Sequence, residues 1–467
     1  MSASDEESRR FALAFLAMLE WVRQGGQVPA NEVVAVVREH LGTDDQDHSV
    51  VTQEMALFEQ VNLQVALNAW SAAPGRDVAV RGFSVPPQYS GVTLQQLLSG
   101  QGLPPMRLSA PALVDLPSGP AGRTQACVQA AIHLVEDDNG RYVVLVRGPD
   151  QHSLPVLTVE IAGLDVAAAQ AVHAGLARLR SELNVYRGQV LEVSSGPQGG
   201  LALQFVDLPP VDREDVVLPA EVLQRIERHT VDVVTHREQL LLAGQHLKRG
   251  LLLFGPPGTG KTHTTRYVVG RLRGCTVLML SGRALDMIGA LAGLARELAP
   301  TVVVLEDVDL VAEERGMYPG GNPVLFELLD TMDGAAADAD LLFLLTTNRA
   351  DLLEPALAAR PGRVDVAVEI GLPDAEARRR LLALYGRGVP LDLTDADVDR
   401  VVQRAEGTTA SFLKELLRRA VLESLTQHSP LLSVTALHVD SALDDLLDSG
   451  QQVTRALLGG GGEPDVG

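Results

Sequence analysis

Residues 255–262 carry the most specific chemical pattern in the sequence, Gly-Pro-Pro-Gly-Thr-Gly-Lys-Thr. This segment matches the phosphate-loop pattern in full, and it lies between an apolar run and a helical segment as that loop requires. Its glycines let successive backbone N–H groups face a phosphate chain, and the following helix points its positive end at the same place. Lys261 can reach the β- and γ-phosphates, and the Thr262 hydroxyl can bind Mg²⁺. The pattern predicts a site for ATP and Mg²⁺, and the residues expected to bind the nucleotide are Gly255, Pro256, Pro257, Gly258, Thr259, Gly260, Lys261, Thr262 and His263.

Two acids and an amide follow later apolar runs. Residues 301–305 are apolar apart from Thr301 and end in Glu306 and Asp307, and residues 341–347 end at Asn348. Successive side chains on a strand point to opposite faces, so we expect Glu306 and Asp307 to take different roles. One acid of such a pair supports Mg²⁺ and the other positions the attacking water. Asn348 is expected to sense the γ-phosphate.

Arg360 and Arg363 flank a Pro-Gly turn. A rigid, exposed pair of arginines can stabilise transition-state charge on the nucleotide of a neighbouring subunit. The alternative is a surface turn whose arginines are solvated.

The elements that must position these residues alternate in type. Short β-rich apolar runs occur at residues 251–254, 276–280, 302–305, 341–346 and 364–370, with helical segments between them. This alternation predicts a parallel sheet with crossover helices. After Pro373 the pattern becomes helical and predicts a lid.

The predicted organisation has six parts. They are an N-terminal helical domain over 1–73, a linker over 74–121, an α+β domain over 122–210, a large ATPase subdomain over 211–373, a helical lid over 374–449 and a flexible tail over 450–467. The linker is predicted from its Gly, Pro and Ser content, and the α+β domain from strand-like runs and a hairpin turn at Asn139–Gly140.

Composition argues against binding to nucleic acid or to a membrane surface. The 467 residues carry 39 basic and 60 acidic side chains, a net charge of −21, and aromatic residues make up only 4%. Such a chain is a poor non-specific ligand for nucleic acid or anionic lipid. Cys127 and Cys275 are the only cysteines, which favours a reducing compartment, so a cytoplasmic location without membrane insertion is expected.

Residues 215–449 resemble the AAA family proper within the AAA+ superfamily of ATPases. Besides the phosphate loop, residues 328–334 look like its subunit-signalling segment, Thr347–Arg349 like its sensor 1, and Gly407–Ala410 like its sensor 2 turn. The resemblance implies an α/β fold with a P-loop AAA+ parallel five-stranded sheet and a helical lid, preceded here by the helical and α+β domains. It also implies a homo-oligomeric ring, expected to be a hexamer, in which Arg360 and Arg363 serve the next subunit. Remodelling, unfolding or translocation of a protein substrate is implied as well, and the N-terminal domains would select that substrate or an adaptor.

The sequence departs from the family at three places. One is length, because the segment between Gly289 and Thr301 and the second pore loop, around residues 318–321, are shorter than is usual for the family. The family usually ends this strand in Asp-Glu, whereas the order Glu306-Asp307 resembles the mitochondrial translocases of an iron–sulfur protein. Role should follow position and not residue type, so the resemblance implies that Glu306 lies on the metal side with Thr262 and that Asp307 lies on the water side. Asp307 is one methylene shorter than the usual base, so the water must lie closer or hydrolysis must slow. The pore loop usually carries an aromatic residue, but the candidate here is Met287-Ile288-Gly289, which could grip a chain or pack in a core.

Two other functions stay open from the sequence. One is a nucleotide-gated assembly scaffold with little hydrolysis, because the exchanged acids leave binding intact. The other is a nucleic-acid motor, against which the acidic charge and the scarce aromatic residues argue.

Overall fold

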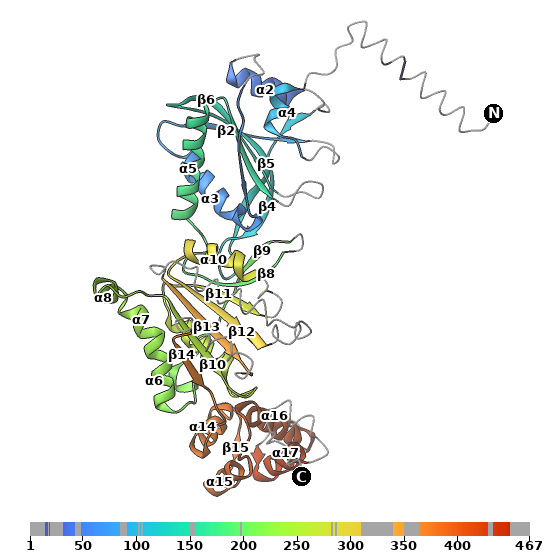
Figure 1. Cartoon of the computed structure of the whole chain (residues 1–467). Helices are drawn as coiled ribbons and strands as arrows, with labels where there is room; N and C mark the ends of the chain where they lie inside the picture. Colours follow the sequence, from blue (N-terminus) through green and yellow to red (C-terminus); the bar gives the residue numbers. More distant parts are fainter. Residues whose placement is uncertain are drawn as a thin grey trace, which may run out of the picture. The chain divides into compact units, whose positions relative to one another are not determined.

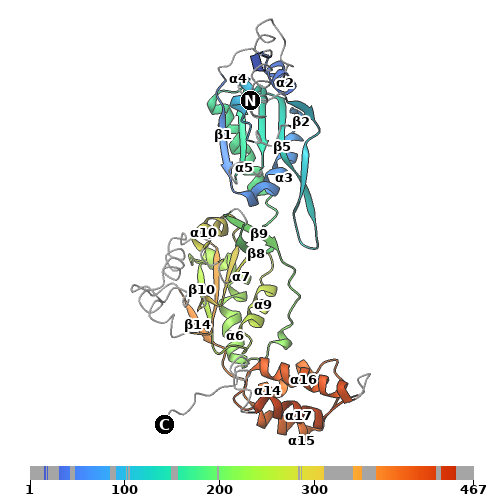
Figure 2. The ribbon, with the colours of Figure 1, turned by 90° about the vertical axis from the view of Figure 1, so that its right-hand side faces the viewer.

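The computed structural model describes residues 31–42, 48–84, 91–100, 103, 106–148, 156–196, 199–281, 284, 287–309, 340–349, 364–427 and 433–448, together with residues 15, 16 and 18. The chain divides into two compact units (Figures 1 and 2). The first reaches residue 185 except for 119–121 and includes 198–200, and the second comprises the rest. Within the described ranges, no helix combines the length and the apolar character needed to cross a membrane.

The first unit is an antiparallel sheet covered by helices. Its strand order is β1-β7-β6-β5-β2-β3, and β4 also pairs with β5. The strands are β1 (Val51–Met55), β2 (Asp77–Ser84), β3 (Arg107–Ser109), β4 (Ala112–Pro117), β5 (Thr124–Asp137), β6 (Gly140–Arg147) and β7 (Leu157–Ala162), and the helices are α2 (Glu32–Leu41), α3 (Gln60–Ser71), α4 (Leu94–Ser99) and α5 (Val166–Glu182).

Both faces of this sheet are buried. On β6, Tyr142, Val144 and Val146 pack in one cluster with residues of α3 and α5, whereas Val143 and Leu145 pack in a second with residues of α2 and α4. The alternation follows from the two-residue period of a strand. The first unit therefore has a core of its own on each side of the sheet.

The predicted N-terminal boundaries are wrong. The segment assigned to a linker over 74–121 contains β2, α4, β3 and β4, and the segment assigned to a helical domain contains β1, which pairs with the distant β7. Most residues of these strands are half-buried or exposed, so their apolar pattern is weak, and the partner of β1 lies far along the chain. The 1–73 and 74–121 parts thus belong with residues 122–185 in one unit.

The second unit contains the expected parallel sheet in extended form. Its order is β14-β10-β13-β12-β11-β8-β9, in which β14 to β11 are the five predicted parallel strands. β8 (Val190–Ser195) pairs parallel with β11, and β9 (Leu201–Phe205) pairs antiparallel with β8. The prediction that placed these two strands in the 122–210 domain is corrected: they extend the ATPase sheet.

The other elements of this sheet and its helices have the following bounds. They are β10 (Arg249–Phe254), β11 (Thr276–Ser281), β12 (Thr301–Glu306), β13 (Leu341–Thr347), β14 (Val366–Glu369), α6 (Ala220–His229), α7 (Val231–Thr235), α8 (Arg237–Leu242), α9 (Lys261–Arg271) and α10 (Ile288–Glu297).

The lid follows as a helical bundle. It consists of α14 (Ala375–Tyr385), α15 (Asp395–Arg404), α16 (Ala410–Gln427) and α17 (Ala436–Leu447), with the short strands β15 (Leu391–Asp392) and β16 (Val434–Thr435). Phe412, Leu413 and Leu416 of α16 are fully buried at its centre.

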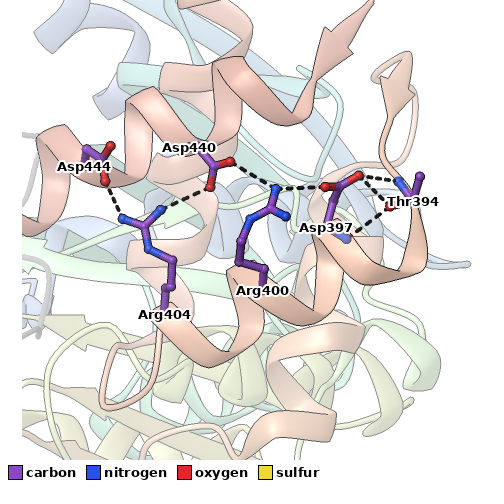
Figure 3. A network of polar contacts seen from close by, with 6 residues as sticks. All are labelled: Thr394, Asp397, Arg400, Arg404, Asp440 and Asp444. Carbon is purple, nitrogen blue, oxygen red and sulfur yellow. Dashed lines mark hydrogen bonds and ion pairs between the residues drawn. The ribbon is translucent and has the colours of Figure 1, made fainter.

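Ion pairs join α15 to α17 on the lid surface (Figure 3). Arg400 contacts Asp397 at 2.8 Å and Asp440 at 3.0 Å, and Arg404 contacts Asp440 at 3.1 Å and also pairs with Asp444. Asp397 in addition accepts hydrogen bonds from the backbone N–H and hydroxyl of Thr394 at the start of α15. We call this set the lid ladder. It connects two helices of the bundle outside its apolar core.

Candidate functional site

The phosphate loop joins the end of β10 to the start of α9, and its glycines are required by geometry. Gly255 has φ 144°, and a Cβ there would lie 2.2 Å from the carbonyl oxygen of Ile370. Gly258 has φ 78°, and its Cβ would crowd the lid residues Ser411 and Thr409. Residues that carry a side chain rarely adopt these φ values, so only glycine fits at the two positions without strain. The loop is thus held tightly between β14 and the lid.

Lys261 is buried beneath this loop and is only 6% exposed. Its Nζ donates to the carbonyl oxygens of Gly255 at 2.8 Å and Pro256 at 2.9 Å. Burial lowers the pKa of the amine, and the charges of Asp307 and Asp309 oppose that shift. The ammonium group therefore lies between the loop and the acids at the end of β12.

The ends of β12 and β13 meet beside Lys261. Asn348 Nδ2 lies 3.4 Å from Asp307 Oδ1, and the backbone N–H of Asp307 donates to Thr346 Oγ1 at 3.0 Å. The strand ends at Glu306, and Asp307 has φ 51° in the left-handed region. Strand alternation, on which the sequence argument relied, therefore does not set the direction of Asp307. The left-handed turn and the bond to Thr346 set it instead.

Glu306 is half-buried, and its Oε1 has no hydrogen-bond partner. Burial raises the pKa of this carboxyl, Asp307 raises it further, and Arg266 and a hydrogen bond with Thr262 oppose the rise. An unpaired carboxylate oxygen next to a threonine hydroxyl fits a divalent cation that prefers oxygen ligands, as Mg²⁺ does. Among the described residues there is no cluster of three or more His, Cys, Asp or Glu side chains that could hold a metal. Thr262 and Glu306 thus suit a cation that arrives bound to a nucleotide and takes some of its ligands from the phosphates.

The start of the lid helix α16 touches the phosphate loop. Gly407 has φ 76°, Thr409 is fully buried, and the backbone N–H of Ser411 donates to the carbonyl oxygen of Gly258 at 3.0 Å. The segment predicted as a sensor 2 turn, residues 407–410, therefore lies against the loop. Motion of the lid would be transmitted to the loop through this contact.

Sequence reasoning missed a cavity of about 580 Å³ beside the loop. Its lining includes Thr259 of the loop, Val217 and Val222 around the start of α6, Ile370 and Leu372 after β14, and Ala410 of the lid. Such a volume with mainly apolar walls is typical of a small-molecule site. The amphipathic helix α6 was the available signal, but only the fold brings it to the loop and the lid.

The remaining predicted residues are placed in part. His263 is exposed, and its Nε2 lies 3.2 Å from the carbonyl oxygen of Asp215. Met287 is half-buried where α10 begins and Gly289 is exposed, so the pore role of 287–289 stays a prediction. Arg360, Arg363, residues 318–321 and 328–334 and the tail over 450–467 lie outside the described residues.

Comparison with known proteins places this site in a family context. Residues 251–372 match the family described as "ATPase family associated with various cellular activities (AAA)". The "ATP-dependent zinc metalloprotease FtsH" of Nitrosococcus oceani is 34% identical over 243 residues, covering 48% of this chain and 36% of that protein. The protein of the same name in Mesoplasma florum is 31% identical over 239 residues, covering 49% of this chain and 36% of that protein. A crystal structure of the FIGL-1 AAA domain in complex with ADP matches with TM-score 0.43 and 23% identity, covering 54% of this chain and 90% of that one.

The chain spans about 36% of the length of these two curated relatives. The matched part contains the phosphate loop, both acids and Asn348. The predicted resemblance and the predicted fold class of residues 251–372 are confirmed by these matches.

Proposed function

Starting from the premise that this chain carries an AAA ATPase domain, we propose that it hydrolyses ATP as a ring and uses the energy to remodel, unfold or translocate a protein substrate. The observation that carries the proposal is the convergence of Lys261, Glu306, Asp307 and Asn348 at one edge of the parallel sheet. The carboxyl ends of parallel strands are where such sheets bind their ligands. The cavity is lined by Thr259 of the phosphate loop and by Ile370, which follows the end of β14.

Binding uses the loop, its lysine and the cavity. Backbone N–H groups of the loop and the positive end of α9 hold the phosphates, and Lys261 turns its ammonium from the loop carbonyls to the β- and γ-phosphates. The cavity of about 580 Å³ is large enough for a nucleoside and borders Thr259 of the same loop. Thr262 and Glu306 would hold Mg²⁺, which when bound neutralises charge on the phosphates.

Hydrolysis is attack of water on the γ-phosphorus, with ADP as the leaving group. Asp307 accepts a hydrogen bond from that water and takes its proton as the new P–O bond forms. Asn348 contacts the γ-phosphate and shares its amide with Asp307, at 3.4 Å from Oδ1. Arg360 and Arg363 of the next subunit complete the site, so hydrolysis depends on assembly, with a hexamer as the proposed ring.

A protein substrate is proposed because the relatives are named as ATP-dependent proteases, and the matched region here is the nucleotide-hydrolysing part. The first unit has its own core and would select the substrate or an adaptor. Met287-Ile288-Gly289 is the proposed pore segment. The free, buried thiols of Cys127 and Cys275 suit the cytoplasm, the location we propose.

The test is steady-state ATP hydrolysis measured against protein concentration. Wild type is compared with Asp307→Asn and Arg360→Ala, and the exposed residues Asp232 and Arg273 provide the matched controls Asp232→Asn and Arg273→Ala. We expect cooperative turnover that both site variants abolish and both controls keep. Tight ATP binding by wild type without turnover would replace this proposal with a nucleotide-gated scaffold. Turnover independent of concentration would refute the requirement for a ring.

A further inference from the structure

Asp309 is a buried acid that the mechanism above does not use. Its side chain is 5% exposed, two residues after Asp307. Oδ1 accepts hydrogen bonds from Thr347 Oγ1 at 2.9 Å and from the backbone N–H of Asn348 at 3.1 Å. Oδ2 lies 3.5 Å from Asn348 Nδ2. Both oxygens of this carboxylate therefore face the end of β13.

The contacts of Asp309 surround Asn348 on each side along the chain. Thr347 precedes Asn348 and donates its hydroxyl to Asp309, while the backbone N–H of Arg349 donates to Thr347 Oγ1 at 3.0 Å. The hydroxyl is thus both donor and acceptor in a short chain of hydrogen bonds, an arrangement in which each bond strengthens the next. The backbone on both sides of Asn348 is fixed through one carboxylate.

The same carboxylate limits the rotation of the Asn348 side chain. Asn348 Nδ2 lies between Asp307 Oδ1 at 3.4 Å and Asp309 Oδ2 at 3.5 Å. A group with acceptors on two sides has one favoured orientation, whereas with one acceptor it can turn away from the site. Misplacement of a positioned group by about 1 Å can lower a rate by about 10²-fold.

We propose that Asp309 is a positioning residue for Asn348. It orients the amide toward the γ-phosphate and toward Asp307 without touching the nucleotide. This inference rests on the proposed function, because Asn348 needs a fixed orientation only if it contacts a γ-phosphate. A purely structural Asp309 would instead support the end of β13 and affect stability alone.

The experiment is a double-mutant cycle between Asp309→Ala and Asn348→Ala in the full chain. Two quantities are measured for each variant. One is kcat with KM for ATP, and the other is the ratio of the dissociation constants for ADP and a non-hydrolysable ATP analogue carrying a β,γ-imido group. Asp340→Asn is the matched control, because Asp340 is a half-buried acid just before β13 that pairs with Arg237 at 2.5 Å. Circular dichroism confirms that each variant is folded.

The expected result is loss of γ-phosphate discrimination without loss of binding. Asp309→Ala should lower kcat about tenfold or more and reduce discrimination as much as Asn348→Ala does, with ADP affinity changed less than about threefold. The double variant should fall within about twofold of Asn348→Ala, because the two side chains act as one unit. Asp309→Asn keeps an acceptor for Thr347 and should lie between wild type and alanine. If Asp309→Ala does not fold, Thr347→Val removes one of the same bonds and should shift both quantities in the same direction.

Several outcomes would overturn the proposal. An Asp309→Ala variant with the kcat and the γ-phosphate discrimination of wild type would do so. Losses of kcat and discrimination that multiply in the double variant would also do so, as would equal losses in Asp340→Asn. If wild type binds nucleotide but does not hydrolyse it, the proposed function fails, and the discrimination ratios alone then decide the role of Asp309. If wild type binds no nucleotide, both proposals fail.

Discussion

Replacing Glu306 with glutamine should stabilise the second unit when Mg–nucleotide is absent and weaken its binding when it is present. The Oε1 atom of Glu306 is buried without a hydrogen-bond partner, and burial together with Asp307 raises the pKa of the carboxyl. At neutral pH the ionised side chain is therefore held in an unfavourable place. Glutamine has nearly the same shape and carries no charge, so the unfavourable contribution should disappear.

The magnitude follows from the charge, because glutamine keeps a polar atom at the same place and removes only the ionised form. An unpaired buried polar atom costs about 1–3 kcal/mol and a charged one more, so removing the charge from this half-buried side chain is expected to recover about 1 kcal/mol. A gain of about 1 kcal/mol raises the melting temperature of a unit of this size by about 2–4 °C. The effect of pH on stability follows from the raised pKa. A carboxyl whose pKa is higher in the folded protein stabilises the fold fully below its pKa in the unfolded chain, about 4.3, and this stabilisation is lost as the pH rises through its pKa in the folded protein. The advantage of glutamine should therefore be present at pH 7 and shrink in acid.

Thermal denaturation measures both effects in one experiment. Wild type, Glu306→Gln and the exposed control Asp232→Asn are melted at pH 7 and in acid, first with a chelator and then with Mg–ADP. We expect the glutamine variant to melt highest with chelator and to gain less from Mg–ADP, where each tenfold loss of affinity removes about 1.4 kcal/mol of stabilisation. A variant that melts below wild type with chelator at pH 7, or that keeps its advantage in acid, would refute the reasoning.

Three further predictions concern the loop, the strand ends and the lid. Gly255→Ala should lower the free energy of unfolding by about 2–4 kcal/mol in urea denaturation, since the new Cβ would lie 2.2 Å from the Ile370 carbonyl oxygen. The control is Gly270→Ala on α9, where the new Cβ meets no atom within 4 Å, so the free energy of unfolding should stay equal or rise. Thr346→Val removes the acceptor of the partly buried N–H of Asp307 and should lower kcat about tenfold, with ATP binding kept. Kinetics equal to those of wild type would show that this bond does not hold the acid. Arg404→Ala opens the lid ladder and should lower stability by up to about 1 kcal/mol at low salt, and melts in about 1 M salt should show a smaller difference, because exposed ion pairs are screened.

The loop and the sheet were predictable because their signals are local. The glycines at 255 and 258 adopt positive φ, and the pattern that identified them depends on this property. Four of the five parallel strands, β10 to β13, are almost fully buried, so each appears as a continuous apolar run such as residues 251–253 or 302–305, whereas β14 at the edge alternates between buried and exposed residues.

The rest could not be predicted because it depends on contacts between distant segments. β1 is a half-exposed strand whose identity comes from its pairing with β7, more than 100 residues away in the register Val51 to Ile161. Asp309 reads as one more acid after a strand, and only the fold shows that it bonds to Thr347 and Asn348. The direction of Asp307 was argued from strand geometry, but the strand ends one residue earlier, and a left-handed turn replaces the alternation.

The two additional strands β8 and β9 limit how this chain can be divided. A fragment that begins near residue 215 would contain every nucleotide-site residue but would remove β8, which pairs with β11 at Val277–Met279. The freed edge would present unpaired N–H and C=O groups, and exposed edges of this kind promote aggregation. A minimal, exchangeable ATPase module should therefore begin before Val190, within the segment that leaves the first unit. Recombination at the boundary suggested by the motifs alone would therefore cut through the sheet of the second unit.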